Sequence, residues 1–177
     1  MHTFQWVRWV ILSGVCLLLG SCGAIQMVKD TTVGIGRRFF FPQIKTLKLD
    51  LIARNALNLD DQGRSLSVVV RIYQLADMGR FQAMTYDNFL HEDKKILGHH
   101  LLACKEVVLV PGRAVNIDEA MVAQTHYIGV VAFFRHVDKG DAWRLWLTKK
   151  TLSNEKPVKL ELNGYRLAVL TSLDPLS

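Results

Sequence analysis

Residues 46–53 read Thr-Leu-Lys-Leu-Asp-Leu-Ile-Ala, and this stretch decides the class of fold. Leu47, Leu49 and Leu51 alternate with polar neighbours. Because successive side chains of a strand point to opposite faces of its sheet, this alternation predicts a half-buried strand. Residues 66–75 predict a second strand, with one face fully apolar and the other partly apolar. Both patterns favour a fold built on β-sheets.

Turn residues separate four further stretches of strand character, which are 103–110, 126–136, 142–148 and 158–169. The stretch 126–136 is the most hydrophobic and is expected at the centre of a sheet. Pro111-Gly112 predicts a turn, because proline fixes φ and glycine tolerates a positive φ. Asn163-Gly164 predicts either a tight hairpin turn or a bulge. Five to seven strands without repeating strand–helix units predict an all-β fold, an antiparallel β-sandwich with short helical insertions.

Residues 78–100 lose the alternation and predict the helical insertions. Asp87 is a candidate N-cap, since its side chain can accept a hydrogen bond from a free backbone N–H. Gly98 is a candidate C-cap, because glycine adopts the left-handed conformation that often ends a helix. The insertion is therefore expected to contain at least one short capped helix.

The first 21 residues have the dimensions of a secretory signal. Their only fixed charge is Arg8, and the apolar run that follows is shorter than the roughly 20 residues that cross a bilayer. Leu19-Gly20-Ser21-Cys22 resembles the bacterial lipobox, in which a cysteine is acylated and becomes the first residue after cleavage. This resemblance implies a covalent lipid on Cys22. The alternative is that Cys22 is incidental and that the segment is an ordinary signal or a membrane anchor.

A lipid on Cys22 has physical consequences for location. Two or more acyl chains hold a protein stably on a bilayer, whereas one chain binds marginally. Gly23 follows the cysteine, in place of the aspartate that retains such lipoproteins at the inner membrane, so the resemblance implies the periplasmic face of the outer membrane. The expected organisation is a signal peptide at 1–21, a lipidated tether or short helix at 22–45, and a β-sandwich at 46–177.

Composition limits the chemistry available to the mature chain. Without residues 1–21 it carries 21 basic and 16 acidic residues, a mild excess with no basic, aromatic-interleaved cluster typical of nucleic-acid binding. Cys104 is the only thiol left once Cys16 is removed and Cys22 is acylated, so no internal disulfide can form. Its neighbours Leu101 and Val107 predict that it is buried.

Motifs for catalysis or metal binding are weak. Ser153-Asn154-Glu155-Lys156 matches the Ser-x-x-Lys of penicillin-recognising enzymes but lacks the accompanying elements. Gly34-Ile35-Gly36 lacks the third glycine of a dinucleotide loop. His99-His100 would point to opposite faces of a strand, and Asp60-Asp61 lacks the spacing of a calcium loop. We expect no enzyme activity, no metal and no cofactor other than the covalent lipid.

The ordered landmarks of the mature chain resemble the outer-membrane lipoprotein of the type VI secretion system, the TssJ family. The matching segments are 45–50, 55–63, 68–75, Phe81 with Asp93, Leu97-Gly98, Val110-Pro111-Gly112, 128–135 and Trp143-Arg144. The resemblance implies a transthyretin-like sandwich with added helices and a structural role in the envelope-spanning membrane complex. The implied partner is the periplasmic C-terminal domain of the inner-membrane protein TssM, with no nucleic acid and no small-molecule substrate.

In the TssJ family the loop between the first two strands makes a principal contact with TssM. The resemblance carries this contact to Asn55, Ala56, Leu57, Asn58, Leu59, Asp60, Asp61, Gln62, Gly63 and Arg64. The residues themselves point to the same loop, which is longer than usual for a hairpin and carries Leu57 and Leu59 among polar residues. These leucines are either exposed anchors for a partner or folded back onto the sandwich.

Other functions remain open from the sequence. A different binding lipoprotein, such as a secretin pilot or a cell-wall-binding module, would share the anchor but use another surface. A lipid-anchored hydrolase would need a nucleophile and a base that converge in a cleft.

Overall fold

The computed structural model describes residues 44–137 and 140–170. The signal peptide, Cys22, and the tether or short helix at 22–45 up to residue 43 lie outside the described residues. In the described part of the chain, no helix is long and apolar enough to span a membrane.

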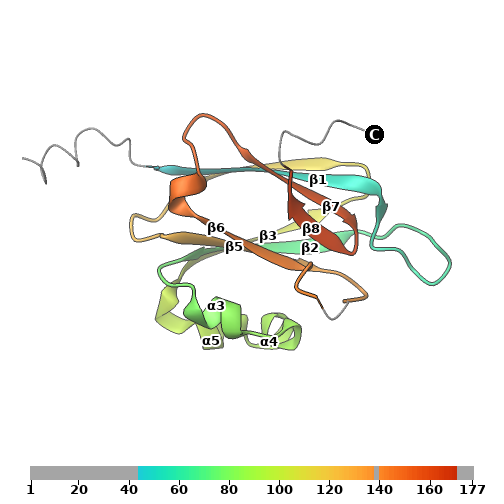
Figure 1. Cartoon of the computed structure of the whole chain (residues 1–177), viewed down its shortest axis with the longest axis horizontal. Coiled ribbons are helices and arrows are strands. Elements are labelled where there is room, and N and C mark those ends of the chain that lie inside the picture. Colours follow the sequence, from blue (N-terminus) through green and yellow to red (C-terminus); the bar gives the residue numbers. More distant parts are fainter. Residues whose placement is uncertain (1–43, 138–139, 171–177) are drawn as a thin grey trace, which may run out of the picture. The chain divides into compact units, whose positions relative to one another are not determined.

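Two four-stranded sheets form the domain (Figure 1). The first sheet has the order β4 (Ala114–Ala120), β1 (Thr46–Leu57), β7 (Val158–Gly164) and β8 (Arg166–Val169). The second has the order β3 (Leu101–Leu109), β2 (Val68–Leu75), β5 (Tyr127–Phe133) and β6 (Arg144–Thr148). This arrangement confirms the β-sandwich, and β5 has a neighbour on each side, as its hydrophobicity predicted.

Two features of the sheets depart from the sequence prediction. β1 and β7 pair in parallel, whereas the other paired strands are antiparallel. The strand β4 was missed, because its polar residues Asn116, Asp118 and Glu119 hide the weak alternation of an edge strand. Asn163 pairs with Arg166, so the connection of β7 to β8 is a tight hairpin turn, with Gly164 at φ +57°.

The core lies between the sheets and follows the alternation that the sequence predicted. Leu47, Leu49 and Leu51 of β1 are at most 1% exposed and belong to the same buried cluster as Val70 and Ile72 of β2. Burial of each such side chain stabilises the fold by about 1.5–3 kcal/mol. This packing holds the domain together without a disulfide in the described residues.

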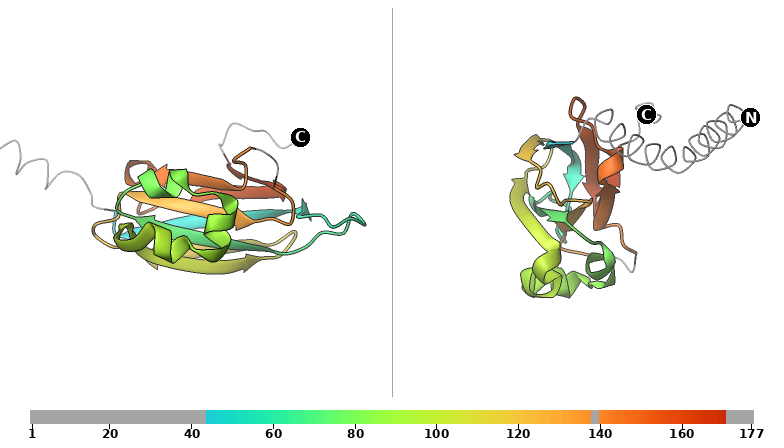
Figure 2. Two further views of the ribbon diagram at one scale, coloured as in Figure 1. Left: turned by 90° about the horizontal axis from the view of Figure 1, so that it is seen from below. Right: turned by 90° about the vertical axis from the view of Figure 1, so that its left-hand side faces the viewer.

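The insertion after β2 contains three short α-helices and a 3-10 turn that cover the outer face of the second sheet (Figures 1 and 2). They are α3 (Gly79–Ala83), α4 (Tyr86–His91), α5 (Asp93–Leu97) and η1 (Gly98–His100). The N-cap of α4 is Thr85 rather than the predicted Asp87, because Thr85 and Asn88 form a reciprocal capping box. Gly98 is the C-cap of α5 at φ +53°, as predicted.

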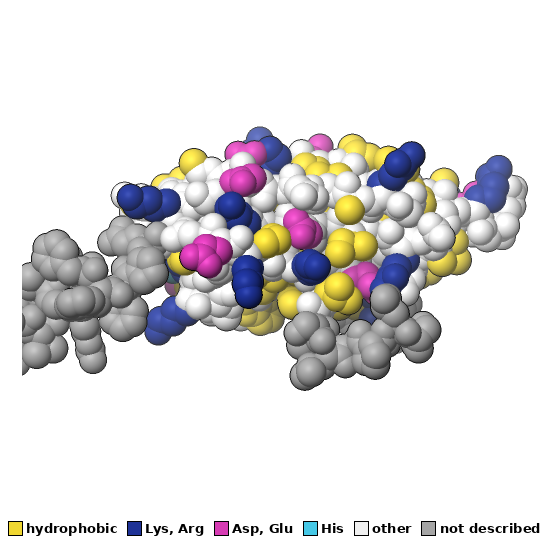
Figure 3. Space-filling view, turned by 90° about the horizontal axis from the view of Figure 1, so that it is seen from above, with side chains coloured by type: hydrophobic (Ala, Val, Ile, Leu, Met, Phe, Trp, Pro, Cys, Tyr) yellow, Lys and Arg dark blue, Asp and Glu magenta, His cyan; other side chains and the backbone are white. Residues whose placement is uncertain are grey.

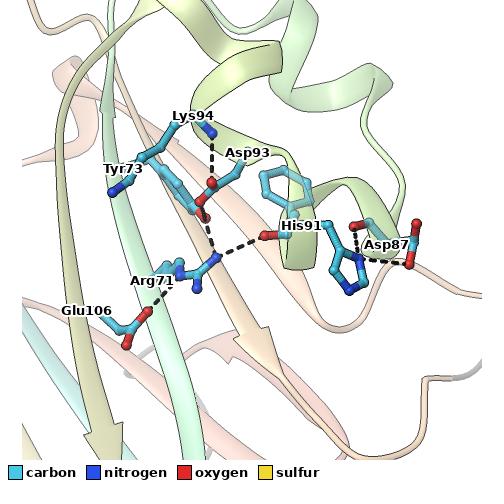
Figure 4. A network of polar contacts seen from close by, with 8 residues as sticks. Arg71, Tyr73, Asp87, His91, Asp93, Lys94 and Glu106 are labelled. Atoms are coloured by element: carbon cyan, nitrogen blue, oxygen red, sulfur yellow. Dashed lines mark hydrogen bonds and ion pairs between the residues drawn. The ribbon is translucent and has the colours of Figure 1, made fainter.

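A buried polar network fixes the insertion to the sheet (Figure 4). The Tyr73 hydroxyl donates to Asp93 Oδ2 at 2.8 Å, and burial followed by this hydrogen bond raises the pKa of Tyr73 far above its usual value. Arg71 contacts the same carboxylate at 3.2 Å, the Phe89 carbonyl at 2.9 Å and Glu106 at 2.7 Å. Each polar group is paired, so the network does not carry the penalty of an unsatisfied buried charge.

Aromatic packing completes the attachment. Phe81 is fully buried, and a Cβ at Gly129 would lie 2.3 Å from its ring, so β5 needs glycine at this point. Phe81 and Phe89 contact each other edge to face, with ring centroids 4.9 Å apart. The insertion is therefore an extension of the core rather than a loose surface loop.

Cys104 corrects one prediction. Its side chain lies exposed on the outer face of β3, opposite Tyr73, rather than buried. An edge strand exposes its outer side chains where the helices do not cover them. Partial loss of hydration, and then the nearby Asp93 carboxylate, raise the pKa of this thiol to about 11. The thiol is consequently protonated and weakly nucleophilic at neutral pH.

Candidate partner-binding site

The loop between β1 and β2 begins and ends later in the sequence than predicted, because β1 continues to Leu57 and β2 begins at Val68. Residues 55–57 of the predicted site are strand residues, and Leu57 is fully buried in the core. Leu57 is therefore not an exposed anchor. Leu59 is partly buried and pairs with Ser65 in an isolated bridge. The remaining loop, residues 58–67, extends beyond the end of the sandwich (Figures 1 and 2).

Asn58 fixes the base of the loop. It is 5% exposed and adopts a left-handed φ of +48°, a conformation that asparagine tolerates better than most residues. Its side-chain oxygen accepts from the Arg135 amide at 2.7 Å, and its side-chain nitrogen donates to the Ser67 carbonyl at 3.2 Å. Its own amide donates to the Gly164 carbonyl. Three separate segments thus meet at one buried residue.

Asp60 shapes the tip of the loop. Its carboxylate accepts hydrogen bonds from the amides of Gln62 and Arg64, both at 2.9 Å, and from the Arg64 guanidinium at 2.7 Å. The hydrogen bond from the Arg64 amide is the largest contribution that lowers the pKa of Asp60 below its usual value. Gly63 completes this turn at φ +77°, where a side chain would be strained.

Contacts with the β5–β6 connection and with the β7–β8 turn hold the loop. Asp61 pairs with Arg135 at 2.8 Å and lies 3.6 Å from His136 Nε2. The Tyr165 hydroxyl donates to the Leu59 carbonyl at 2.7 Å, and its ring packs edge to face on His136. Asp60 and Asp61 thus each form an ion pair with an arginine, Asp60 with Arg64 and Asp61 with Arg135.

Exposed apolar side chains surround this held loop. Leu66 is 36% exposed, Val137 is 36% exposed and Val110 is 48% exposed. Val110 is placed here by the Pro111-Gly112 turn, in which the Gly112 amide donates to the Arg54 carbonyl. Gly112 has the positive φ expected of this turn. We call the surface formed by loop 58–67 and these valines the loop end of the sandwich.

The sequence could not assign these additional residues to the site. Arg135 and Tyr165 lie 77 and 106 residues from their loop partners, so no local pattern joins them to it. The sequence predicts Leu66 and Val110 as end residues of two strands. The available signal was the position of Leu66, Val110 and Arg135 at or near the ends of predicted strands, and the position of Tyr165 directly after the predicted Asn163-Gly164 turn.

The remaining motifs have structural explanations. Ser153 accepts hydrogen bonds from the amides of Glu155 and Lys156, a local turn. His99 and His100 lie in η1 with ring centroids 3.9 Å apart, so the prediction that they occupy opposite faces of a strand is wrong. In the described residues, no three His, Cys, Asp or Glu side chains are placed to hold a metal ion.

Comparisons with known proteins agree with this architecture. A chain of a structure described as "Type VI membrane complex" is 39% identical, with 73% of this chain and all of that chain covered and a TM-score of 0.70. A chain of a structure described as "T6SS protein TssM C-terminal domain (869-1107) from EAEC" is 36% identical, with 72% and 99% covered and a TM-score of 0.65.

A more distant structure shares the fold. The type VI lipoprotein TssJ1 of Pseudomonas aeruginosa is 23% identical, with 74% of this chain and 98% of that chain covered and a TM-score of 0.63. A search of curated protein sequences finds no match. The family model for the type VI secretion lipoproteins VasD, EvfM, TssJ and VC_A0113 matches residues 45–165, which include every strand but the last. This chain belongs to the type VI secretion lipoprotein family.

Proposed function

We propose that this protein is a non-enzymatic outer-membrane component of a type VI secretion complex that binds the periplasmic C-terminal domain of TssM. In this proposal a lipid on Cys22 fixes the protein to the periplasmic face of the outer membrane. The loop end of the sandwich, formed by residues 58–67 with Val110 and Val137, binds TssM. No catalytic step is assigned to any residue.

The observation that carries the proposal is the length of one matched chain. The aligned 72% of this 177-residue chain covers 99% of its match, which makes that match about 130 residues long. The range 869–1107 named in the description of that structure spans 239 residues. A chain so much shorter, and 36% identical to a type VI lipoprotein, fits a lipoprotein present beside the TssM domain better than the TssM domain itself.

The geometry of the loop end supports binding at this place. The hydrogen bonds of the buried Asn58 and of the Asp60 carboxylate fix the conformation of the loop. Little conformational entropy would therefore be lost when a partner binds. Exposed Leu66, Val110 and Val137 give it the apolar area that interface centres use, and paired charges surround them. β1 runs for about 36 Å between Thr46, near the residue at which a tether would join the domain, and this end of the sandwich.

Replacement of residues 60–64 by a five-residue Gly-Ser linker tests the binding role. This choice leaves Leu57 and Asn58 in place, since their removal would damage the core. Binding of the purified TssM periplasmic domain, measured by calorimetry, is expected to weaken at least a hundredfold while the thermal midpoint changes by a few degrees. Unaltered affinity would remove the loop from the mechanism.

Cys22→Ser tests the lipid. Metabolic labelling with radioactive palmitate is expected to disappear, and the protein to leave the outer-membrane fraction. Labelling equal to that of the native chain would contradict the lipid assignment. The fold of the sandwich is not at issue in this variant, because residue 22 precedes the described domain.

A further inference from the structure

The opposite end of the sandwich, where the chain enters the domain, has a different character. The Lys45 carbonyl accepts from the Met121 amide at 2.8 Å, and the Lys45 amide donates to Asn154 Oδ1 at 3.0 Å. The Lys149 amide donates to the His126 carbonyl. The start of β1, the β4–β5 connection and the β6–β7 connection therefore meet here. We call the surface formed by residues 44–46, 121–126 and 148–157 the entry end.

Four lysines gather on the entry end. Lys45, Lys150 and Lys156 are exposed, and the partly buried Lys149 donates through Nζ to the Ala123 carbonyl at 3.3 Å. Glu155 is the only acidic residue in these three segments. None of the four lysines forms an ion pair with another described residue.

Several lysines elsewhere on the surface form ion pairs. Lys48 pairs with Asp118, Lys105 with Glu119 and Lys95 with Glu92. Over the face viewed from above, basic and acidic side chains are interspersed (Figure 3). Other basic residues, such as Lys94 on α5 and Arg113 in the β3–β4 turn, also form no ion pair with a described residue, but they lie on separate elements. The gathering of four lysines, and not the lack of ion pairs alone, distinguishes the entry end.

We infer that the lysines of the entry end bind acidic phospholipid headgroups of the membrane to which the protein is tethered. The inference rests on the proposed lipid at Cys22. The 22 residues from Cys22 to Gln43 join the domain at Ile44, so a lipid tether would attach at this end. Each lysine close to an anionic bilayer strengthens binding by about fivefold. With the entry end against the membrane, the loop end faces away, toward a partner that crosses the periplasm.

A vesicle-binding experiment tests the inference with a matched control. The unlipidated chain from Gly23 to Ser177 is floated with vesicles of phosphatidylcholine alone or mixed equally with phosphatidylglycerol. Lys150→Ala/Lys156→Ala is expected to bind the acidic vesicles about 25-fold more weakly than the native chain. Lys94→Ala/Lys95→Ala removes the same charge from α5 and should change binding less than twofold. Equal losses in both variants, or equal binding to both vesicles, would overturn the inference.

Two further measurements separate the possible explanations. Addition of 10 mM inorganic phosphate at constant ionic strength should leave vesicle binding unchanged. Displacement from the vesicles would assign the lysines to free phosphate instead.

In the acylated native protein on acidic vesicles, Lys150 and Lys156 should react with acetic anhydride several-fold more slowly than Lys94. Equal rates would contradict membrane contact. The lysine variant should bind the TssM domain normally, so failure of this inference is distinguishable from failure of the proposed function.

Discussion

The two segments that flank β2 in the sequence, a loop and a helical insertion, are attached to the sandwich in different ways. The helical insertion, residues 76–100, follows β2 and is joined to the sheet by Tyr73, Asp93 and the buried ring of Phe81. The loop 58–67 precedes β2 and is held by Asn58 and by exposed ion pairs. The insertion shares the core and contributes to stability. The loop leaves its tip and neighbouring apolar side chains exposed, which suits it to binding.

The largest expected effect comes from the insertion. Phe81→Ala removes a fully buried ring from the slot above Gly129 and should lower the free energy of unfolding by about 3–5 kcal/mol, because it leaves a cavity. Chemical denaturation monitored by tryptophan fluorescence measures the loss. A change below 1 kcal/mol would mean that the insertion is not part of the core.

Asp93→Ala should have the next largest effect. The substitution leaves the Tyr73 hydroxyl without its acceptor and deprives Arg71 of one of its two carboxylate partners, at a cost of about 2–3 kcal/mol. Asp93→Asn retains an acceptor oxygen and should lose less, which denaturation of the two variants side by side would reveal. Equal losses would contradict the role of the acceptor oxygen in the network.

Asn58→Ala tests the buried part of the loop attachment. It leaves the Arg135 amide without an acceptor and places alanine at a left-handed φ, so a loss of about 1–3 kcal/mol is expected. Asn58→Gly removes the same hydrogen bonds but tolerates the backbone, and should lose less. The thermal midpoints of both variants report the difference; identical midpoints would rule out a contribution from backbone strain.

The exposed ion pair of the loop should matter least for stability. Asp61→Ala and Arg135→Ala are each expected to change the free energy of unfolding by at most about 0.5 kcal/mol, since both side chains are largely exposed. A double-mutant cycle measures the pair directly. A coupling above 1.5 kcal/mol would place the loop with the insertion as a stabilising element.

The loop also has a predicted pH dependence. The pKa of Asp60 is lowered in the folded loop, so its contribution to order is complete above the ordinary value of 3.8 and is lost as the pH falls through the lower folded value. The amide signals of Gln62 and Arg64 in NMR spectra should therefore keep their positions from pH 7 to pH 5 and move below pH 3.8. Movement between pH 7 and pH 5 would contradict the lowered pKa.

The sequence predicted the sandwich because leucine alternation in β1 and the apolar run of β5 are local signals. It missed β4, whose polar residues mask its alternation, and it placed Cys104 inside because neighbouring apolar residues do not reveal which face a helix covers. For the candidate site, it predicted a loop between the first two strands but placed Leu57 in that loop, whereas Leu57 is the last residue of β1. The length of β1 depends on its pairing with β7, which no local pattern reveals. Arg135 and Tyr165 reach the loop only through the fold.

The central claim is that the loop 58–67 binds the partner and that the insertion stabilises the core. Hydrogen–deuterium exchange of the protein with and without the TssM periplasmic domain tests this claim most directly. The account predicts that binding slows exchange of the amides at residues 59–66 and 135–137. Exchange at residues 79–97, in the insertion, should not change. Slower exchange in the insertion with no change in the loop would contradict the assignment of binding to the loop end.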